Sequence, residues 1–510
     1  MKKQISLGIV LQYIQLALSI VVSLLYTPYM IKILGQSEYG LYNLSSSIIS
    51  YLSLISLGLG SSYLRFYFMQ RKNNPEKIKS LNGLYFLMFS IIGIIALIAG
   101  FVLSQNVSLF FNETYSSSDE RIASILMIFL TINLAISLPM NVFVGYVMSQ
   151  EKFIFLKLIN IVKTVLSPAI SIVALLLGYG SIGLVFISTA ISIVADIINI
   201  FYCFKVLKMP FSFKKMDLSL VKPIFVFSIF IAINQLVDQI NWQTDKVVLG
   251  KMMSSVAVSI YAIGATFNNY FMMFGTSVSS VFVPRVNAIV QSDFDGKAIN
   301  IKLTELMIKV GRLQFMVLGL VLSGFIIFGQ TFIRLWVGND FDLSYFVAIL
   351  LMGPLLPDLL MTLGIEVQKA KNLHKFRSFL YLGMAIVNVG ISILLVKALG
   401  IIGAALGTSI SFILINDIVM TIYYHEKVKI DMVKFWLSIL KMSACLIFPV
   451  VLGIGLNRLL PKTLPMFIVG VIIYTIMYVI SLYFLGMDES EKSAFSNFLK
   501  KIKMNKDKKQ

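Results

Sequence analysis

The residues best suited to chemistry in this chain are polar side chains that lie inside long apolar stretches. Four of them, in the seventh apolar stretch, follow one another at spacings of 4, 3 and 4: Asn234, Asp238, Asn241 and Asp245. These spacings place all four on one face of a helix, which we call the seventh-span polar stripe. Amides bind hydroxyl groups, and a carboxylate held away from water either takes up a proton or holds a cation. Asp238 is therefore a candidate for ligand binding and for coupling to sodium ions or protons.

A matching set of polar side chains lies in the first apolar stretch. Its members, which we call the first-span polar stripe, are Gln12, Gln15, Ser19, Ser23 and Tyr26. The last three each precede a member of the seventh-span polar stripe by 215 residues. Two aligned polar faces suit a water-filled cavity between the two helices. The alternative is hydrogen bonding that only holds the helices together. We favour the cavity and predict that the stripe binds substrate.

Lys163 and Asn160 lie on one polar face of the fifth apolar stretch. Gly178-Tyr179-Gly180 predicts a hairpin between the fifth and sixth stretches. Lys163 precedes this turn by about as many residues as Asp196 follows it, so the two side chains should lie at the same depth. They would then form a buried structural ion pair. The alternative is that the Lys163 ammonium and Asn160 bind a substrate phosphate in the cavity. Both interpretations stay open.

Three further charged residues are site candidates. Arg65 and Arg285 end the second and eighth stretches on the same predicted side of the membrane. Guanidinium groups bind diphosphate oxygens in pairs. The alternative role for both is ordinary anchoring of a basic membrane face. Asp358 follows Pro357 near the middle of the tenth stretch, where a buried carboxylate is a candidate for ion coupling.

The elements that position these residues are membrane-spanning helices. Of the 510 residues, 58% are hydrophobic and only 13% are charged, about half the share in soluble domains. The sequence therefore predicts an all-α polytopic membrane protein with about fourteen spans. The expected spans are 6–33, 41–68, 81–103, 122–148, 153–177, 181–204, 219–242, 253–282, 308–333, 344–366, 378–397, 401–424, 435–456 and 465–485.

The basic residues predict the orientation of these spans. About three quarters of the 43 Lys and Arg residues fall at the N-terminus, in alternate loops and in the C-terminal tail. Cationic loops stay in the cytoplasm, so both termini should be cytoplasmic. This spread over short loops does not suggest a nucleic-acid partner. The longest loop is expected near Arg285–Met307, too short for a catalytic domain, and the two cysteines predict neither a disulfide nor a metal site.

An internal repeat divides the chain. Short matches recur in order at offsets of 215 to 221 residues, including Leu34-Gly35 with Leu249-Gly250 and Ile182-Gly183 with Ile402-Gly403. The pattern predicts an N-terminal six-helix lobe over 1–210 and a C-terminal six-helix lobe over 211–430. Two additional spans and a basic tail follow over 431–510. Two lobes of parallel topology should enclose a cavity and work by alternating access.

The six-plus-six-plus-two arrangement resembles a known family. So does the turn after the first span, which reads Leu34-Gly35-Gln36-Ser37-Glu38-Tyr39-Gly40-Leu41-Tyr42-Asn43. Both are similar to the Wzx-type polysaccharide flippases of the multidrug/oligosaccharidyl-lipid/polysaccharide exporter superfamily. The resemblance implies a flippase of undecaprenyl-diphosphate-linked oligosaccharides in the bacterial cytoplasmic membrane, serving capsule, O-antigen or exopolysaccharide synthesis. It makes a polysaccharide polymerase and chain-length machinery candidate partners, and we expect a monomer.

Three other functions are alternatives to this one. A lipid II flippase and a cation-coupled multidrug exporter belong to the same superfamily, and the amide and hydroxyl groups of the first and seventh spans favour a glycan cargo. An integral-membrane polysaccharide polymerase would need a large outer loop or a mid-membrane His/Asp set, which the sequence lacks. There is also no phosphate-binding loop for ATP. We therefore predict no catalytic residues and no cofactor, apart from a coupling ion.

Overall fold

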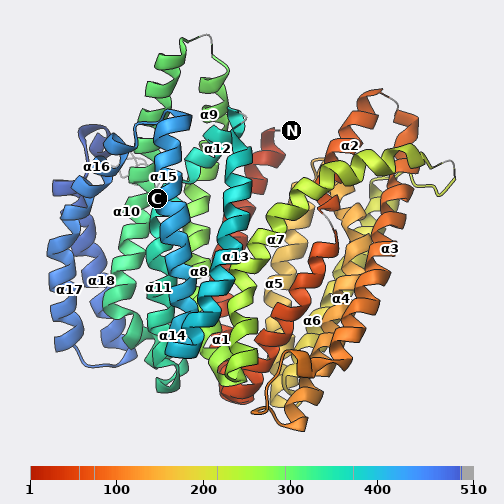
Figure 1. The fold of residues 1–510 in the computed structure, drawn as a ribbon, viewed down its shortest axis with the longest axis horizontal. Coiled ribbons are helices and arrows are strands. Elements are labelled where there is room, and N and C mark those ends of the chain that lie inside the picture. Colours follow the sequence, from red (N-terminus) through yellow and green to blue (C-terminus); the bar gives the residue numbers. More distant parts are fainter. Residues whose placement is uncertain are drawn as a thin grey trace, which may run out of the picture. The chain divides into compact units, whose positions relative to one another are not determined.

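The computed structural model describes residues 2–493 and 496, apart from positions 57, 74, 215, 293 and 372. For residues 2–10, 73, 75, 230, 374 and 375 it describes the backbone only. The described residues form helices joined by short turns, without a β-strand (Figure 1). The prediction of an all-α polytopic fold is confirmed. Most of the predicted basic tail, from position 497 onward, lies outside the described residues.

Eighteen α-helices are present in the described chain. They are α1 Lys2–Leu52, α2 Leu59–Asn73, α3 Ile78–Gln105, α4 Ser117–Ser149, α5 Phe153–Leu176, α6 Gly180–Phe201, α7 Val221–Met252, α8 Ser255–Ser280, α9 Val283–Val290, α10 Gly296–Val337, α11 Asp342–Leu360, α12 Thr362–Ala370, α13 His374–Leu399, α14 Ile401–Phe412, α15 Met420–Tyr423, α16 Met432–Ser443, α17 Ile447–Leu459 and α18 Leu464–Ser481.

Short 3₁₀ and π segments extend or join these helices. The 3₁₀ segments are η1 Ser53–Ser56, η2 Pro75–Lys77, η3 Val107–Leu109, η5 Leu218–Leu220, η6 Asn339–Phe341 and η9 Ala444–Leu446. The π segments are η4 Tyr202–Val206, η7 Ile413–Val419, η8 Tyr424–Val428 and η10 Leu482–Gly486.

By length and composition, the described chain has 12 helical segments able to cross a membrane. The count reaches 13 when α8 and α9, bent by 42°, are taken as one span. Leu11–Lys72 is one of these 12 segments. As a straight helix its 62 residues would extend roughly 93 Å, about three times the thickness of the hydrocarbon layer. Gly35 breaks its helical backbone with φ 75° and ψ 172°. This break lies between the first two predicted spans.

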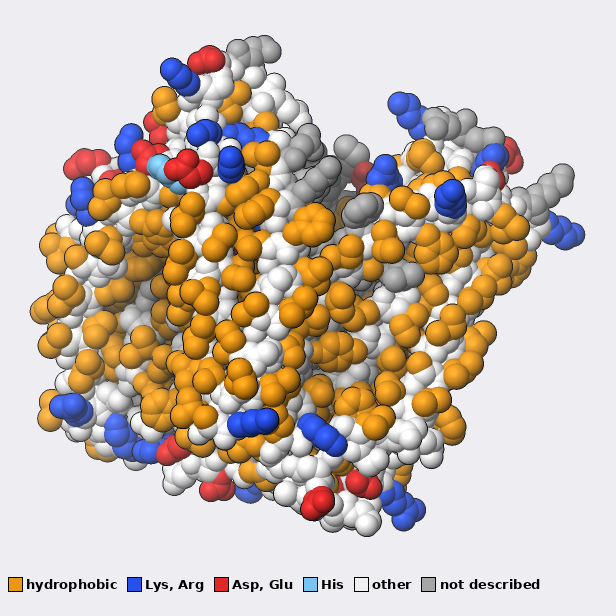
Figure 2. Space-filling model, in the orientation of Figure 1, with side chains coloured by type: hydrophobic (Ala, Val, Ile, Leu, Met, Phe, Trp, Pro, Cys, Tyr) orange, Lys and Arg blue, Asp and Glu red, His pale blue; other side chains and the backbone are white. Residues whose placement is uncertain are grey.

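The outward faces of the helices are apolar, as contact with lipid requires. On α3, Ile94 and Ile98 are 58% and 61% exposed, whereas Tyr85 and Phe89 on the other face are buried. Figure 2 shows hydrophobic side chains over the middle of the visible helices and charged side chains gathered near their ends. In lipid every backbone polar group must be satisfied within the protein, which is why the spanning segments are helical.

Three details of the predicted spans are wrong. The second span is broken, because η1 and the turn at Gly58 (φ 68°) separate α1 from α2. The long loop expected at Arg285–Met307 is mostly helical, since it contains α9 and the first three turns of α10. The tenth span ends at Leu360, three residues beyond Pro357, and a separate helix, α12, follows.

Contacts divide the chain into two compact units. Unit 1 comprises Met1–Ala262 and Ala385–Gly407, and unit 2 comprises Ile263–Met384 and Thr408–Gln510. Within unit 1, α4 packs on α3 and α6, and α1 packs on α5 and α7. Within unit 2, α10 contacts α11, α16 and α18. These units follow packing, whereas the predicted lobes follow sequence repetition, so the division at residues 210 and 430 stays a prediction.

Candidate functional site

The first-span polar stripe follows the line along which α1 packs against α5. At one end the Lys157 ammonium donates a hydrogen bond to Oε1 of Gln12. At the other end Tyr26 and Ser171 share a hydrogen bond between hydroxyl groups. Positions 12 and 26 are close to four helical turns apart, so the stripe between them also faces α5. Its middle members, Gln15, Ser19 and Ser23, are half-buried.

A different polar row joins α1 to α7. We call it the α7 glutamine row; it consists of Gln235, Gln239 and Gln243, at intervals of one helical turn. Ser47 Oγ donates to Gln243 Oε1 at 2.9 Å, and Ser50 Oγ donates to Gln239 Oε1 at 3.1 Å. Two members of the row therefore hold α7 against the second half of α1.

The seventh-span polar stripe lies on another side of α7, roughly 130° around the helix axis from the glutamine row. Asn234 and Asp238 are exposed, whereas Asn241 and Asp245 are buried. Tyr261 of α8 donates a hydrogen bond to Asp245 Oδ2 at 2.5 Å. The four side chains therefore share one face of α7, which is exposed at Asn234 and Asp238 and buried at Asp245.

Lys163 and Asp196 lie on neighbouring helices, α5 and α6, joined by the predicted hairpin at Gly178–Gly180. Lys163 is close enough for its charge to act on the Asp196 carboxylate. The ion pairs within 4.0 Å in the described chain do not include these two side chains. Both are half-buried, and Asn160, one turn before Lys163, is exposed. No direct contact among the described residues therefore decides between the two roles of Lys163, the structural ion pair and ligand binding.

The predicted arginine Arg65 lies on α2 against α7. Its guanidinium carbon is 4.2 Å from the centre of the Phe227 ring, a cation–π distance. The side chain is exposed. Stacking leaves the edge donors of a guanidinium group available to an anionic group, so this placement is compatible with diphosphate binding.

Arg285 contributes to a pocket of about 740 Å³ between α9 and the start of α10. Lys302, Glu305 and Lys309 line the same pocket from α10, at spacings of 3 and 4 that share one helix face. Three cations against one carboxylate leave an excess of two positive charges. The Lys302 ammonium lies 3.0 Å from the centre of the Phe294 ring. We call this the α9–α10 cationic pocket, and its charge suits a phosphate or diphosphate group.

Asp358 lies in α11 beside an arginine and a tyrosine of α13. Tyr381 OH is 3.5 Å from Asp358 Oδ1, and Arg377 Nη2 donates to Tyr381 OH at 2.8 Å. The Arg377 guanidinium carbon is also 4.3 Å from the centre of the Tyr381 ring. The charge of Arg377 acts on Asp358. We call this group of three the Asp358–Arg377 cluster.

Two polar residues of η7 adjoin this cluster. Asp417 is close enough to Asp358 for their charges to interact. Asn416 is 1% exposed, and its side chain lies within hydrogen-bonding reach of Asp358, whereas Asp417 Oδ1 has no hydrogen-bond partner among the described residues. The side-chain atoms of the described neighbours therefore leave hydrogen-bonding capacity unused at this place.

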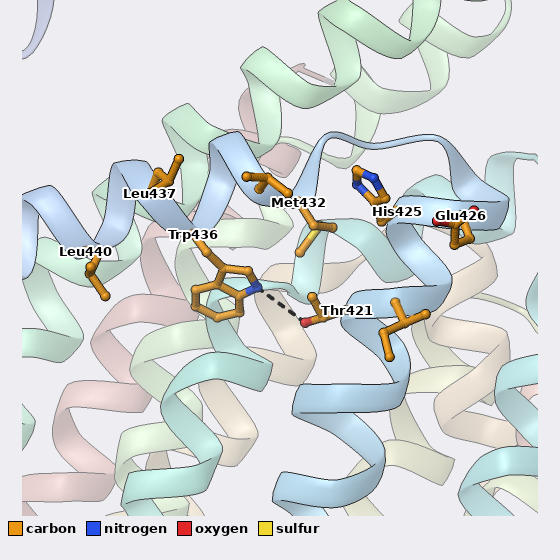
Figure 3. A pocket seen from close by; sticks show the side chains of 9 residues that line it. Thr421, His425, Glu426, Met432, Trp436, Leu437 and Leu440 are labelled. Atoms are coloured by element: carbon orange, nitrogen blue, oxygen red, sulfur yellow. Dashed lines mark hydrogen bonds between the residues drawn. The ribbon is translucent and has the colours of Figure 1, made fainter.

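A further pocket lies at the end of the segment that contains α15 and η8, beside α16 (Figure 3). Trp436 Nε1 donates to Thr421 Oγ1 at 3.3 Å along one wall. Leu437 and Leu440 form another wall and are 52% and 70% exposed. The lining is mostly apolar, and apolar patches of this kind often mark interaction sites.

The sequence-based reasoning missed several of these residues. It placed Arg377 just outside the expected span 378–397, although Tyr381 follows it at i+4 and their side chains meet on one helix face. It did not single out Lys302 and Lys309, whose spacing of seven residues places them on a common face. It also favoured the charged face of α7 over the glutamine row. Among the described residues no group of three or more His, Cys, Asp or Glu is arranged to hold a metal ion.

A family model described as "Polysaccharide biosynthesis protein" matches residues 6–290, more than half of the chain. The chain belongs to the polysaccharide biosynthesis protein family. The resemblance drawn from the Leu34–Asn43 turn is thereby confirmed. This family member is also similar to the uncharacterized membrane protein EpsK of Bacillus subtilis (strain 168), with 24% identity over 422 residues and 80% of each chain covered.

Solved structures show the same fold. The lipid II flippase MurJ in an inward closed conformation matches with a TM-score of 0.72 and 19% identity, over 93% of this chain and 97% of that one. An inward-facing multidrug resistance MATE family transporter of the MOP superfamily matches with a TM-score of 0.60 and 13% identity, over 82% and 98%. This polysaccharide biosynthesis protein is therefore a multi-pass membrane protein with the fold of the MurJ and MATE transporters.

Proposed function

We propose that this protein moves undecaprenyl-diphosphate-linked oligosaccharides across the bacterial cytoplasmic membrane by alternating access, with both termini in the cytoplasm. Family membership supports a role in polysaccharide biosynthesis, and the transporter fold supports movement of a lipid-linked intermediate. The observation that carries the proposal is the α9–α10 cationic pocket. Its excess of two positive charges, contributed by Arg285, Lys302 and Lys309 against Glu305, matches the diphosphate that all such cargo shares.

The same pocket argues against one alternative. A multidrug exporter of organic cations would need carboxylate or aromatic surfaces rather than a surplus of ammonium and guanidinium groups. A lipid II flippase remains the second candidate, because lipid II also carries an undecaprenyl diphosphate and the MurJ fold matches over nearly the whole chain. Polysaccharide polymerases and chain-length machinery are candidate partners, and a monomer suffices for the proposed cycle.

Ion coupling belongs to the same proposal. Asp238 is exposed on α7, and Asp358 lies beside Arg377, which already supplies it with a cation. With the charge of Arg377 nearby, this carboxylate has less need of a sodium ion, and movement of that charge away from it would favour uptake of a proton. We assign proton exchange to Asp358 and leave sodium or proton coupling to Asp238.

The test is complementation of flippase-deficient strains across several glycan pathways and a lipid II flippase mutant. We expect rescue of at least one glycan pathway and loss of that rescue in Arg285→Ala and Lys302→Ala. Lys297→Ala is the matched control, because Lys297 lies on the same helix, is exposed and does not line the pocket. Rescue of no pathway together with increased drug efflux would refute the proposal, and rescue of the lipid II mutant alone would favour the second candidate.

A further inference from the structure

A cavity of about 360 Å³ opens where the second predicted span is broken. Close approach of three helices forms it: a methyl group at Gly58 would lie 2.6 Å from Ile231 of α7, and one at Gly145 of α4 would lie 2.6 Å from the Tyr63 ring of α2. The turn at Gly58 therefore packs closely against α7, and Tyr63 of α2 packs closely against α4. Residues of η1, α2, α3, α4 and α7 line the cavity beside these contacts.

The α7 glutamine row leads directly to this cavity. Gln243 and Gln239 accept hydrogen bonds from Ser47 and Ser50 on α1. One turn further, Gln235 reaches the level of the break and lines the cavity instead. Its amide makes no hydrogen bond to another described side chain or backbone group. The third member of a bonded row is therefore left available for a ligand.

Other polar groups in the cavity are equally available. Ser56, Ser61 and Asn141 line it from η1, α2 and α4. None of these side chains makes a hydrogen bond within the described chain. Phe89 and Leu64 supply apolar wall. With Gln235, two amides and two hydroxyl groups from four segments converge on one space, where each is able to donate and accept.

The cavity carries no charge on the described residues that line it. A phosphate, an ammonium group or a metal ion would enter without a counter-charge, which is costly away from water. A lipid chain would leave two amides and two hydroxyl groups unsatisfied. The ligand that fits is neutral, rich in hydroxyl groups and partly apolar, of a size in the range of small-molecule pockets.

We propose that this cavity, the α2–α4–α7 pocket, binds one or two neutral sugar residues of the cargo oligosaccharide. This inference rests on the proposed function, in which the diphosphate is recognised elsewhere by cationic groups. Gln235 and Asn141 contact the sugar hydroxyl groups, and the serines of the broken span complete the site. Selection among glycans then depends on these uncharged side chains, whereas affinity for the lipid diphosphate does not.

The test compares two ligands on the purified full-length protein. One is bare undecaprenyl diphosphate, and the other is the undecaprenyl-diphosphate oligosaccharide of the pathway that the wild-type chain rescues. Gln235→Met and Asn141→Leu should each weaken binding of the glycan-bearing lipid about three- to tenfold, as loss of one or two neutral hydrogen bonds predicts, and leave binding of the bare lipid unchanged. Gln239→Met is the matched control: it removes the bond to Ser50 and should not separate the two ligands.

A labelling experiment provides a second test of the pocket if Gln235→Met or Asn141→Leu folds poorly. The two native cysteines, Cys203 and Cys445, are buried, so a water-soluble maleimide should report mainly on an introduced thiol. Gln235→Cys should be labelled in membranes, and the glycan-bearing lipid should slow labelling at least several-fold while the bare lipid does not. Equal effects of both lipids, or wild-type affinity in the two variants, would overturn the inference. Failure of every complementation would instead overturn the proposed function.

Discussion

Glu38, in the turn that carries the family resemblance, offers a stability prediction with a defined structural cause. Its Oε1 accepts hydrogen bonds from the backbone N–H and the hydroxyl group of Ser181, both at 2.6 Å. Ser181 lies in the first turn of α6, where backbone N–H groups have no partner within the helix and the helix dipole favours a negative charge. Glu38 therefore caps α6 from a distant part of the chain.

The magnitude follows from these contacts. Hydrogen bonds to a charged group are worth about 1.5–3 kcal/mol each when buried, but Glu38 is half-buried and water replaces part of the loss. We expect Glu38→Ala to lower the free energy of unfolding by about 2 kcal/mol. Glu38→Gln keeps a hydrogen-bond acceptor and removes the charge, so it should lower the free energy of unfolding by about 1 kcal/mol.

The assay is thermal unfolding in detergent, followed with a thiol-reactive fluorophore. It suits this protein because Cys203 and Cys445 are buried and react only when the fold opens. Glu113→Gln is the control, since Glu113 is exposed and should leave the unfolding midpoint unchanged. If Glu38→Ala unfolds at the wild-type midpoint, the capping argument is wrong. A Glu38→Gln midpoint below that of Glu38→Ala would also contradict it.

Two further variants test packing and a buried ion pair. Arg312 Nη2 and Nε donate to the Glu491 carboxylate at 2.6 and 2.8 Å, and both side chains are mostly buried. Arg312→Ala should lower the free energy of unfolding by about 3–5 kcal/mol, because it leaves the buried Glu491 carboxylate without its cation. Equal stability of Arg312→Ala and the wild type in the same thermal assay would refute this. A methyl group at Gly40 would lie 1.8 Å from the Ser255 carbonyl oxygen, so Gly40→Ala should sharply reduce the yield of folded protein on size-exclusion chromatography, whereas Gly390→Ala, with open space around it, should not.

The sequence predicted helices and turns correctly where a local pattern was enough to define them. Gly178 lies between α5 and α6, and Gly180 is the first residue of α6; their φ angles are 83° and 58°, values that glycine adopts readily. Apolar length predicted the spanning helices, because a bilayer requires about 20 apolar residues for each crossing. The break near Gly58 was missed, since Ser and Gly residues also occur within continuous membrane helices.

The site was less predictable because it depends on which helix face meets which neighbour. Both polar faces of α7 are visible as patterns in the sequence. Only packing shows that Gln239 and Gln243 face α1 whereas Asn234 and Asp238 remain exposed. Arg377 likewise appears to be a loop charge until α13 and α11 bring it to Tyr381 and Asp358.

The sequence by itself thus determined the membrane class, the helical fold and the family. These follow from composition, period and local motifs, which act over one or two helical turns. The tertiary structure alone decided that Arg285 shares a pocket with Lys302 and Lys309, and that Gln235 opens onto a neutral cavity rather than bonding to α1. Such pairings join residues far apart in the chain, and their geometry is set by how the helices pack.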